Sequence, residues 1–407
     1  MIPTGLSYFK DKRVLLLQGP LGPFFRRLSA DLTGSGSSVW KVNFNGGDWL
    51  FYPSGGIAYR GKLDEWPLYL EELLDRHAID TIMLYGDCYP IHRLARDVAK
   101  RRKLHVWVFE EGYIRPDYVT FEYSGVNGKP KVLVDEMRGP TGQRFREAPS
   151  FQVRHAYWLS VIWACLYYVF ASLGKPFFPH YRHHRPLSIL EAGPWVRGAW
   201  RKIFYAVKEK SILEKLTGPL SKKFYLVPLQ VHNDSQVSAH SDFDSVETFI
   251  RKIVFSFAEH APNDYFLVFK HHPMDRAYRD YGKIIQTLST DSGLGDRVIY
   301  VHDLHLPSLL RCALGVVVIN STVGFSALYH GTPVKVCGRA VYDLEGLTFQ
   351  GSLEEFWKNR RKILVDRGVF QCFKNYLIET TQLNGSFYSR LPTSDSSTGL
   401  IWDYDRK

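Results

Sequence analysis

Val106-Trp107-Val108-Phe109-Glu110-Glu111-Gly112 is a short apolar run that leads directly into two acids and a glycine. A second stretch has the same pattern, an apolar run followed by polar residues, here one lysine and two histidines: Phe266-Leu267-Val268-Phe269-Lys270-His271-His272-Pro273. Short apolar runs bounded by polar or turn residues are typical of buried strands. We therefore predict strands at residues 106–109 and 266–269, each ending at a polar motif.

Outward from the first stretch, strands and helices alternate along residues 1–150. The further predicted strands are 13–18, 39–45 and 81–86, and the predicted helices are 24–32, 68–77 and 91–102. Around the second stretch the same alternation returns. Its further predicted strands are 224–228, 298–301, 316–319 and 334–336, and its predicted helices are 246–260, 307–312 and 324–330. Alternation of this kind predicts parallel sheets covered by helices.

The expected fold class is therefore α/β, with two Rossmann-like domains. We predict an N-terminal domain at residues 1–150, a helical aromatic and basic connecting segment at 151–220, a C-terminal domain at 221–345, and a C-terminal helical segment and tail at 346–407. Ligands of open parallel sheets gather beyond the carboxyl ends of the strands. Both polar motifs are predicted to lie at such ends.

Composition limits the partners. The chain has 407 residues, 45% hydrophobic content and a formal net charge of +11. A positive excess suits nucleic acid, a phospholipid surface or a phosphorylated sugar donor. No zinc finger, RNA-binding signature or long basic run is present, which disfavours nucleic acid. Five cysteines without a CxxC pair indicate a reducing compartment, and the N-terminus does not resemble a signal peptide.

Residues 156–174 contain no charged residue and are rich in tryptophan and tyrosine. Three interpretations remain open: a transmembrane span, a helix buried between the domains, and an aromatic helix at a membrane interface. Burial is the interpretation that the sequence favours. Residues 197–223 are strongly basic and suit either anionic lipid headgroups or a solvated helix face.

Glu110 and Glu111 are candidates for acid–base or nucleophilic chemistry because sugar transfer needs a carboxylate near the anomeric carbon. Gly112 allows a tight turn or a close approach to a ligand. Arg115 follows and is able to orient a carboxylate. Two solvated acids at a strand end are the plain structural alternative.

In the second motif, Pro273 restricts His272 to an extended backbone. A histidine there can donate a hydrogen bond to a departing phosphate. Asn320-Ser321-Thr322 leads from a predicted strand into a helix, where hydroxyl groups either cap the helix or hold a phosphate. No metal-binding spacing is evident, so we expect no metal ligand set.

Further polar residues lie at the remaining predicted strand ends. Gln230 and Asp234 follow the first strand of the second domain, within Gln230-Val231-His232-Asn233-Asp234-Ser235-Gln236. The matching positions of the first domain hold a set that we assign to the acceptor side: Gly19, Gly22, Asp48, Asp87 and His92. Capping or turn formation also explains any one of these residues.

Read together, these segments resemble the bacterial capsular polysaccharide biosynthesis family, specifically its single-module β-Kdo transferases that start a lipid-linked poly-Kdo linker. The resemblance rests on the two motifs above, the segments around Gln230 and Asn320, and three further segments: Gln18-Gly19-Pro20-Leu21-Gly22-Pro23-Phe24-Phe25, Asn45-Gly46-Gly47-Asp48 and Tyr85-Gly86-Asp87. It implies a GT-B-like architecture whose two parallel sheets face a central cleft. It also implies a CMP-Kdo donor, a phosphatidylglycerol-type acceptor, and transfer that retains the β configuration.

The resemblance also implies roles for single residues. Glu111 corresponds to the family's acid before glycine, often aspartate there, so Glu110 and Glu111 both stay candidates for the reactive group. His272 would meet the CMP phosphate, Ser321 and Thr322 would hold it, and a metal would not be essential. The implied donor-side set is Lys270, His271, Pro273, Gln230, Asp234, Asn320, Ser321, Thr322 and Arg115.

The expected location is the cytoplasmic face of the inner membrane, with peripheral attachment, a lipid or lipid-linked glycan acceptor, and other capsule assembly proteins as further partners. Two other functions remain open. One is an inverting transferase similar to CMP-sialic acid transferases, and the other is a non-catalytic capsule assembly or export component that binds lipid-linked glycan.

Overall fold

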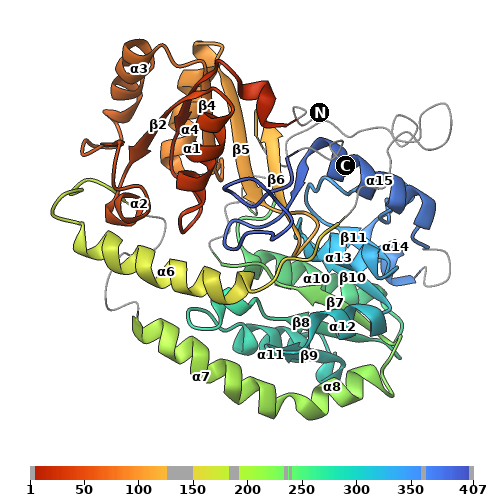
Figure 1. Cartoon of the computed structure of the whole chain (residues 1–407). Helices are drawn as coiled ribbons and strands as arrows, with labels where there is room; N and C mark the ends of the chain where they lie inside the picture. The colour runs from red at the N-terminus through yellow and green to blue at the C-terminus, as the bar shows by residue number, and fades with distance from the viewer. Residues whose placement is uncertain are drawn as a thin grey trace. The chain divides into compact units, whose positions relative to one another are not determined.

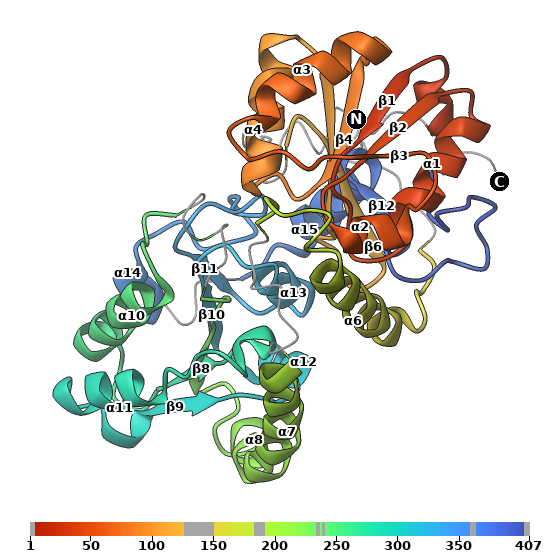
Figure 2. The ribbon, with the colours of Figure 1, turned by 90° about the vertical axis from the view of Figure 1, so that its left-hand side faces the viewer.

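The computed structural model describes residues 5–125, 150–182, 192–232, 237, 241–358 and 364–402. The chain forms two compact units (Figures 1 and 2). Unit 1 contains the described residues 5–125, 150–182 and 374–402, and unit 2 contains those between 192 and 373.

The sheet of unit 1 has the strand order β12-β6-β5-β4-β1-β2-β3. The strands from β3 to β5 are parallel, whereas β6 and β12 are antiparallel to their neighbours. The strands are β1 (Arg13–Leu16), β2 (Ser38–Asn43), β3 (Gly56–Ala58), β4 (Thr81–Tyr85), β5 (His105–Glu111), β6 (Tyr118–Tyr123) and β12 (Gln382–Asn384). The chain order reverses between β1 and β4, which is the switch point where ligands of such sheets bind.

Helices cover both faces of this sheet. Alternate residues of β1 point to opposite faces: Leu15 packs with α3 and α4, and Leu16 packs with α1 and the C-terminal segment. The helices of the unit are η1 (Leu6–Phe9), α1 (Phe24–Gly34), α2 (Gly46–Phe51), α3 (Trp66–His77), α4 (Pro90–Arg101) and α6 (Ala156–Leu173).

The sheet of unit 2 is parallel throughout, with the order β11-β10-β7-β8-β9. Its switch point lies between β7 and β10. The strands are β7 (Phe224–Pro228), β8 (Phe266–Lys270), β9 (Val298–Val301), β10 (Gly315–Val318) and β11 (Val334–Val336).

One face of this second sheet packs on α10, α11 and α14 in a continuous apolar core. The helices of the unit are α7 (Ala192–Lys208), α8 (Lys210–Thr217), α10 (Val246–His260), η3 (Pro273–Asp275), α11 (Gly282–Asp291), η4 (Gly295–Arg297), α12 (Leu306–Cys312), α13 (Val323–Tyr329) and α14 (Leu353–Lys358). Helix α15 (Arg367–Thr380) begins in unit 2 and ends in unit 1. Local chemistry fixes some bounds; for example, Ser245 accepts a hydrogen bond from the N–H of Thr248 and so begins α10.

The predicted α/β class is confirmed: each unit has a core of parallel strands, to which unit 1 adds two antiparallel strands, and the two Rossmann-like units are those that a GT-B-like architecture requires. The division of the chain differs from the predicted segments. Residues 156–173 fold with unit 1 and residues 192–217 with unit 2. Residues 374–402 are part of unit 1 rather than a separate tail, because β12 pairs with β6 and closes the edge of the first sheet.

Helix α6 differs from the interpretation that the sequence favours. Only 11% of its 18 residues are buried, and its mean hydropathy is 1.5. By length and composition it qualifies as a membrane-spanning helix, a test that some core helices of soluble proteins also pass. In the structure it lies along α2 on the surface of unit 1 (Figure 2).

Candidate active site

Glu110 and Glu111 are the last two residues of β5 rather than residues beyond it. They pair with Thr120 and Val119 of the antiparallel strand β6, which extends β5 past its predicted end. Because successive side chains of a strand point to opposite faces, the two carboxyl groups are in different surroundings. Gly112 follows with the backbone of Tyr118 against it, so a Cβ there would collide with the Tyr118 carbonyl oxygen.

The surroundings of Glu110 favour its neutral form. Burial raises the pKa of this carboxyl to about 8, and the charges of Glu111 and Asp87 also raise it. The backbone N–H of Glu111, which donates to Oε1 of Glu110 at 3.2 Å, and the charge of Arg115 act in the opposite direction. Glu110 is therefore mostly protonated at neutral pH.

Glu111 is held by a side chain that the sequence did not suggest. The hydroxyl of Tyr388 donates to Oε1 of Glu111 at 3.0 Å, across 277 residues of chain. Burial, followed by the charge of Glu111, raises the pKa of Tyr388 well above its usual value, so this phenol stays a donor. Arg115 is exposed, and its Nε donates to the Gly112 carbonyl at 3.1 Å.

Two of the predicted acceptor-side residues, Gly22 and Asp48, contact helix α6, and together with Gly19 and Tyr167 they line a small pocket. Asp48 is buried and accepts from the hydroxyl of Tyr167 at 3.0 Å, and Gln18 donates to the same hydroxyl at 3.0 Å. Gly22 has a φ of +117°, and a Cβ there would meet the ring of Trp163 at 3.0 Å. A Cβ on Gly19 would meet the Phe25 ring at 2.7 Å.

The Asn45-Gly46-Gly47-Asp48 segment has the same role. A Cβ on Gly46 would collide with the backbone of Phe170, and a Cβ on Gly47 would meet the Tyr167 ring at 2.7 Å. The side chain of Asn45 accepts from the N–H groups of Gly47 and Asp48 and so begins α2. This motif forms the surface on which α6 packs, and Asp48, the one motif residue predicted for the acceptor side, is part of that surface.

Asp87 and His92 also lie inside unit 1. Asp87 is 5% exposed and accepts from Arg96 at 3.0 Å. His92 is fully buried, with Nδ1 at 2.6 Å from the Gly86 carbonyl oxygen, and burial lowers its pKa to about 4. His92 is therefore neutral and supports the turn after β4.

In unit 2 the switch point carries a direct contact. Nε2 of Gln230, after β7, donates to Oδ1 of Asn320, after β10, at 3.0 Å. Ser321 and Thr322 follow and are partly exposed; Oγ of Ser321 accepts from the N–H of Val323 at 3.2 Å. The predicted donor-side residues Gln230, Asn320, Ser321 and Thr322 thus gather at the place where α/β sheets bind ligands. Asp234 lies outside the described residues.

His272 is partly exposed and Pro273 is exposed, in the turn after β8. Nδ1 of His272 accepts from the N–H of Met274 at 3.1 Å and so begins η3. A neutral imidazole whose Nδ1 accepts carries its proton on Nε2, which makes Nε2–H the donor for any further partner.

A carboxylate–histidine pair stands beside this turn. Asp275 is fully buried and accepts from Nδ1 of His232 at 2.6 Å and from the His232 N–H at 2.7 Å. These contacts join the loop after β7 to the loop after β8. The sequence does not predict this pair, although both residues lie in or beside the polar motifs, because the two positions are 43 residues apart.

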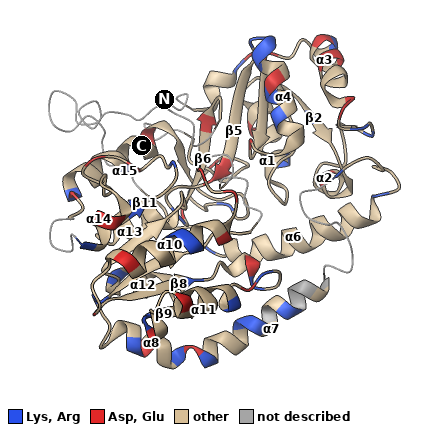
Figure 3. Cartoon of the chain, turned by 180° about the vertical axis from the view of Figure 1, so that it is seen from behind, with Lys and Arg blue, Asp and Glu red and all other residues tan. Residues whose placement is uncertain are grey.

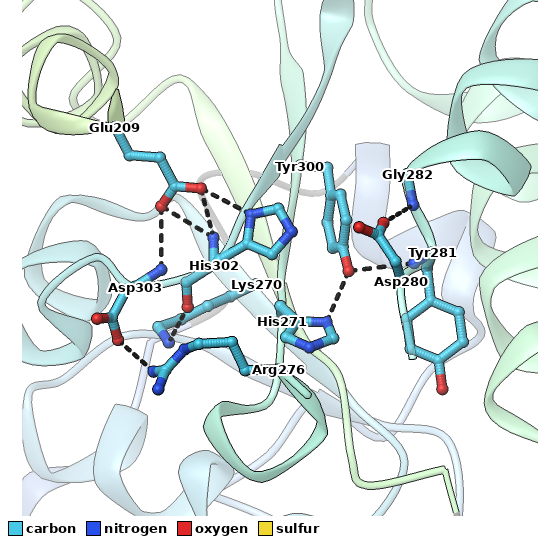
Figure 4. A network of polar contacts seen from close by, with 10 residues as sticks. All are labelled: Glu209, Lys270, His271, Arg276, Asp280, Tyr281, Gly282, Tyr300, His302 and Asp303. Atoms are coloured by element: carbon cyan, nitrogen blue, oxygen red, sulfur yellow. Dashed lines mark hydrogen bonds and ion pairs between the residues drawn. The ribbon is translucent and has the colours of Figure 1, made fainter. Parts of the chain in front are cut away.

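Lys270 and His271, by contrast, belong to an interior network (Figure 4). His271 is 1% exposed, with Nδ1 at 2.6 Å from the Tyr300 hydroxyl, and burial lowers its pKa to about 3. Lys270 is 7% exposed and donates to the His302 carbonyl at 3.4 Å. Their predicted contact with a donor does not fit these buried positions; they support the strand end instead.

The same network attaches α7 and α8 to the sheet. Glu209 accepts from Nδ1 of His302 at 2.7 Å and from the N–H of Asp303 at 3.0 Å. Burial alone would raise the pKa of Glu209, but these hydrogen bonds lower it below its usual value overall. Among the described residues, no three His, Cys, Asp or Glu side chains are grouped so that they could hold a metal ion.

By fold, the protein is a two-unit α/β protein with polar groups at the carboxyl ends of both sheets. A family model described as "Capsule polysaccharide biosynthesis protein" matches residues 80–388. The chain belongs to this capsule polysaccharide biosynthesis family.

Curated relatives extend over nearly the whole chain. The protein is 41% identical to the "Capsule polysaccharide export protein KpsS" of Escherichia coli, over 93% of this chain and 97% of that protein. It is 39% identical to the "Capsule polysaccharide modification protein LipB" of Neisseria meningitidis serogroup A, over 95% of each chain. A solved structure, "Thermosulfurimonas dismutans KpsC, beta Kdo 2,7 transferase", matches with a TM-score of 0.43 and 16% identity, over 95% of this chain and 94% of that one. No conclusion follows from a structural likeness at this level.

Proposed function

We infer that the protein is a glycosyltransferase of capsule biosynthesis that transfers Kdo from CMP-Kdo to a phosphatidylglycerol-type lipid and retains the β configuration. Membership of the capsule family supports the setting, and the motif resemblance supports the donor and the acceptor. The observation that carries the proposal is the carboxyl pair at the end of β5, whose two members have different surroundings.

A buried, protonated carboxylic acid next to a second carboxyl group in different surroundings is typical of acid–base assignments. With a pKa of about 8, Glu110 is protonated and unsuited to attack carbon. Glu111, held by Tyr388, is the group that we assign as nucleophile or charge stabiliser at the anomeric carbon. As nucleophile, it forms the bond to that carbon while the bond to the CMP phosphate oxygen breaks and CMP leaves with the electron pair. The acceptor hydroxyl oxygen then forms its bond to the anomeric carbon while the bond to Glu111 breaks; Glu111 leaves as a carboxylate with the electron pair, and the hydroxyl proton passes to water.

Unit 2 would bind the CMP group. Nε2–H of His272 is the donor for the departing phosphate, Ser321 and Thr322 hold that phosphate, and Gln230 with Asn320 forms the floor of the site. We add His232 to this set as an acceptor: buried Asp275 fixes its ring with the proton on Nδ1, which leaves Nε2 to accept a hydrogen bond from a hydroxyl or amino group of CMP. CMP is a good leaving group, so we expect transfer without a divalent metal.

For the acceptor, we propose a lipid at the cytoplasmic face of the inner membrane, with peripheral attachment of the protein and contacts to other capsule assembly proteins. We do not expect nucleic acid as a partner. That the Glu110–Glu111 pair and His272 act on one nucleotide-sugar is part of the same proposal.

Purified protein incubated with CMP-Kdo and a phosphatidylglycerol acceptor tests the proposal. Glu111→Gln should reduce turnover by about a thousandfold or more, as expected for loss of a nucleophile, and His272→Ala by about a hundredfold. Glu72→Gln, on the exposed surface of α3, is the matched control and should be fully active. Full activity of both site variants would show that Glu111 and His272 do not form the active site. Nuclear magnetic resonance of the product distinguishes retention from the inverting alternative.

A non-catalytic role in capsule assembly or export is the second candidate. The 41% identical Escherichia coli relative, which is named as a capsule polysaccharide export protein, favours it. Binding of lipid or glycan without any release of CMP in the same assay would support this alternative and overturn the transferase.

A further inference from the structure

Helix α7 has one face that is fixed to unit 2. Arg201, Tyr205 and Glu209, at the end of the helix, recur every four residues and therefore lie on one side. Arg201 donates to the Arg276 carbonyl at 2.7 Å, and the Tyr205 ring stacks on His302 with ring centroids 3.7 Å apart. Glu209 accepts from His302 at 2.7 Å. The orientation of the helix about its axis is thus set by three contacts, two of them to His302.

The other side of α7 presents large apolar side chains. Trp200, Ile203, Phe204 and Val207 are 62%, 69%, 42% and 76% exposed. Their spacing of three and four residues places them in one stripe along the helix. The rings of Trp200 and Phe204 stack with centroids 5.3 Å apart, which makes part of the stripe a continuous flat surface. We call these four residues the α7 stripe.

Basic residues flank the α7 stripe. Residues 192–208 contain Arg197, Arg201, Lys202 and Lys208 and no acid. Arg197 and Lys208 are exposed, and Nζ of Lys208 lies 5.5 Å from the centre of the Phe204 ring. Figure 3 shows basic residues along α7, whereas α6 carries none. Apolar side chains between cations are complementary to a surface that is anionic outside and apolar just beneath.

We propose that the α7 stripe is the docking surface of this protein for an anionic phospholipid bilayer. The helix lies in the plane of the membrane interface, with the four apolar side chains at the boundary between headgroups and acyl chains. Arg197 and Lys208 contact lipid phosphates at the same depth. Helix α6 is also apolar and exposed, but it has no charged residue that would favour an anionic surface over another apolar partner.

This docking surface does not depend on the transferase proposal. It predicts binding to any anionic bilayer, including one without the proposed acceptor. Each cation near an anionic surface strengthens binding by about fivefold, and the two flanking cations together by about 30-fold. The attraction between exposed charges should weaken at high salt.

Flotation of the full chain with vesicles tests the proposal. The vesicles contain equal parts of phosphatidylcholine and phosphatidylserine, or phosphatidylcholine alone, so the proposed acceptor is absent. The wild type should float with the anionic vesicles at low salt. Ile203→Ser with Val207→Ser should weaken binding by about tenfold or more, because two apolar side chains leave the interface. Arg197→Gln with Lys208→Gln should weaken it by about 30-fold.

Matched double variants elsewhere serve as controls. Leu68→Ser with Phe255→Ser removes two apolar side chains that are 67% and 52% exposed, and Arg251→Gln with Lys283→Gln removes two exposed cations of unit 2. Both controls should bind as the wild type does. Absence of wild-type flotation, or equal flotation of the stripe variants and the wild type, overturns the proposal.

A protein partner would give a different result. If the stripe variants change the oligomeric mass in light scattering while flotation is unaltered, the α7 stripe is an interface between copies and the membrane proposal is wrong. Release of CMP from CMP-Kdo, measured with a soluble acceptor, should be the same in the stripe variants and the wild type. The two proposals are therefore tested independently: a negative transferase assay does not contradict the membrane docking surface, and a negative flotation assay does not contradict the transferase.

Discussion

The carboxyl edges of the two sheets are used in parallel but chemically different ways. In unit 1, the edge at β1 and β2 is occupied by α6, whose Tyr167 hydroxyl contacts Gln18, Asn45 and Asp48. In unit 2, the edge at β9 is occupied by Glu209, which contacts His302 and Asp303. In each case, a helical segment from between the two sheets in the sequence makes hydrogen bonds to polar groups at the strand ends. Without that segment, these polar groups would be available to a ligand.

The two edges differ in the charge of the side chain that attaches the helical segment. Unit 1 holds its helix with a neutral phenol, and burial raises the pKa of Tyr167 well above its usual value. Unit 2 uses a carboxylate whose pKa is lowered by the groups that it accepts from. The remaining half of each edge carries the candidate chemistry: the carboxyl pair of β5 in unit 1 and the Gln230–Asn320 contact in unit 2. A polar residue at a strand end is therefore a site candidate only where no helix is docked on it.

The largest effect is expected from Glu209→Ala. The substitution leaves the N–H groups of His302 and Asp303 buried without their acceptor, and we expect a loss of about 3–5 kcal/mol in the free energy of unfolding of unit 2. Hydrogen exchange should rise in β9 and α7 and stay unchanged in β1. Equal protection of β9 in the variant and the wild type would break the comparison.

The second-largest effect is expected in the pH dependence of the unfolding free energy. It comes from Glu110, which lies at the part of the unit 1 sheet edge that no helix occupies. Because folding raises the pKa of Glu110 from 4.5 to about 8, its contribution to stability is complete below pH 4.5 and is lost as the pH rises through 8. Glu110→Gln stays neutral, so its unfolding free energy should fall less than that of the wild type between pH 6 and 9, by roughly 2 kcal/mol. If the unfolding free energy of the two proteins changed with pH in the same way, Glu110 would be charged in the folded state.

Glycine substitutions test whether α6 truly docks on α2. Gly47→Ala places a methyl group against the Tyr167 ring and should cost about 1–3 kcal/mol in the free energy of unfolding. Gly34→Ala, in α1 with no atom within 4 Å of the added group, is the matched control and should be neutral or slightly stabilising. Denaturant unfolding followed by circular dichroism measures both, and equal effects would contradict the docking.

Tyr167→Phe is the mildest change. It keeps the ring and removes only the hydroxyl shared by Gln18, Asn45 and Asp48, so we expect a loss of about 1 kcal/mol. The measurement is again the free energy of unfolding, with Tyr168→Phe in the next position as a second tyrosine for comparison. A cost as large as that of Glu209→Ala would remove the chemical difference between the two edges.

Local sequence patterns predicted much of the fold. The predicted helix at 246–260 and strands at 224–228, 298–301 and 334–336 have the observed bounds. Capping, apolar periodicity and strand length are local properties, so a single sequence displays them. Strand β12 escaped prediction because it pairs with β6 across more than 250 residues of chain. Strand β6 also escaped prediction, although it pairs with the preceding strand β5.

The candidate site was accessible only in part. The motifs located the strand ends, and residues such as Glu111, His272 and Gln230 keep the places that the sequence predicts for them. Asp48, His92, Lys270 and His271 have the same residue types at the same kind of position, yet they are buried in structural networks. The sequence alone determined which residues stand at strand ends, because this depends on neighbours along the chain. Only the tertiary structure decided which of them a docked helix occupies, because partners such as Tyr167 and Glu209 come from about 90 to 120 residues away.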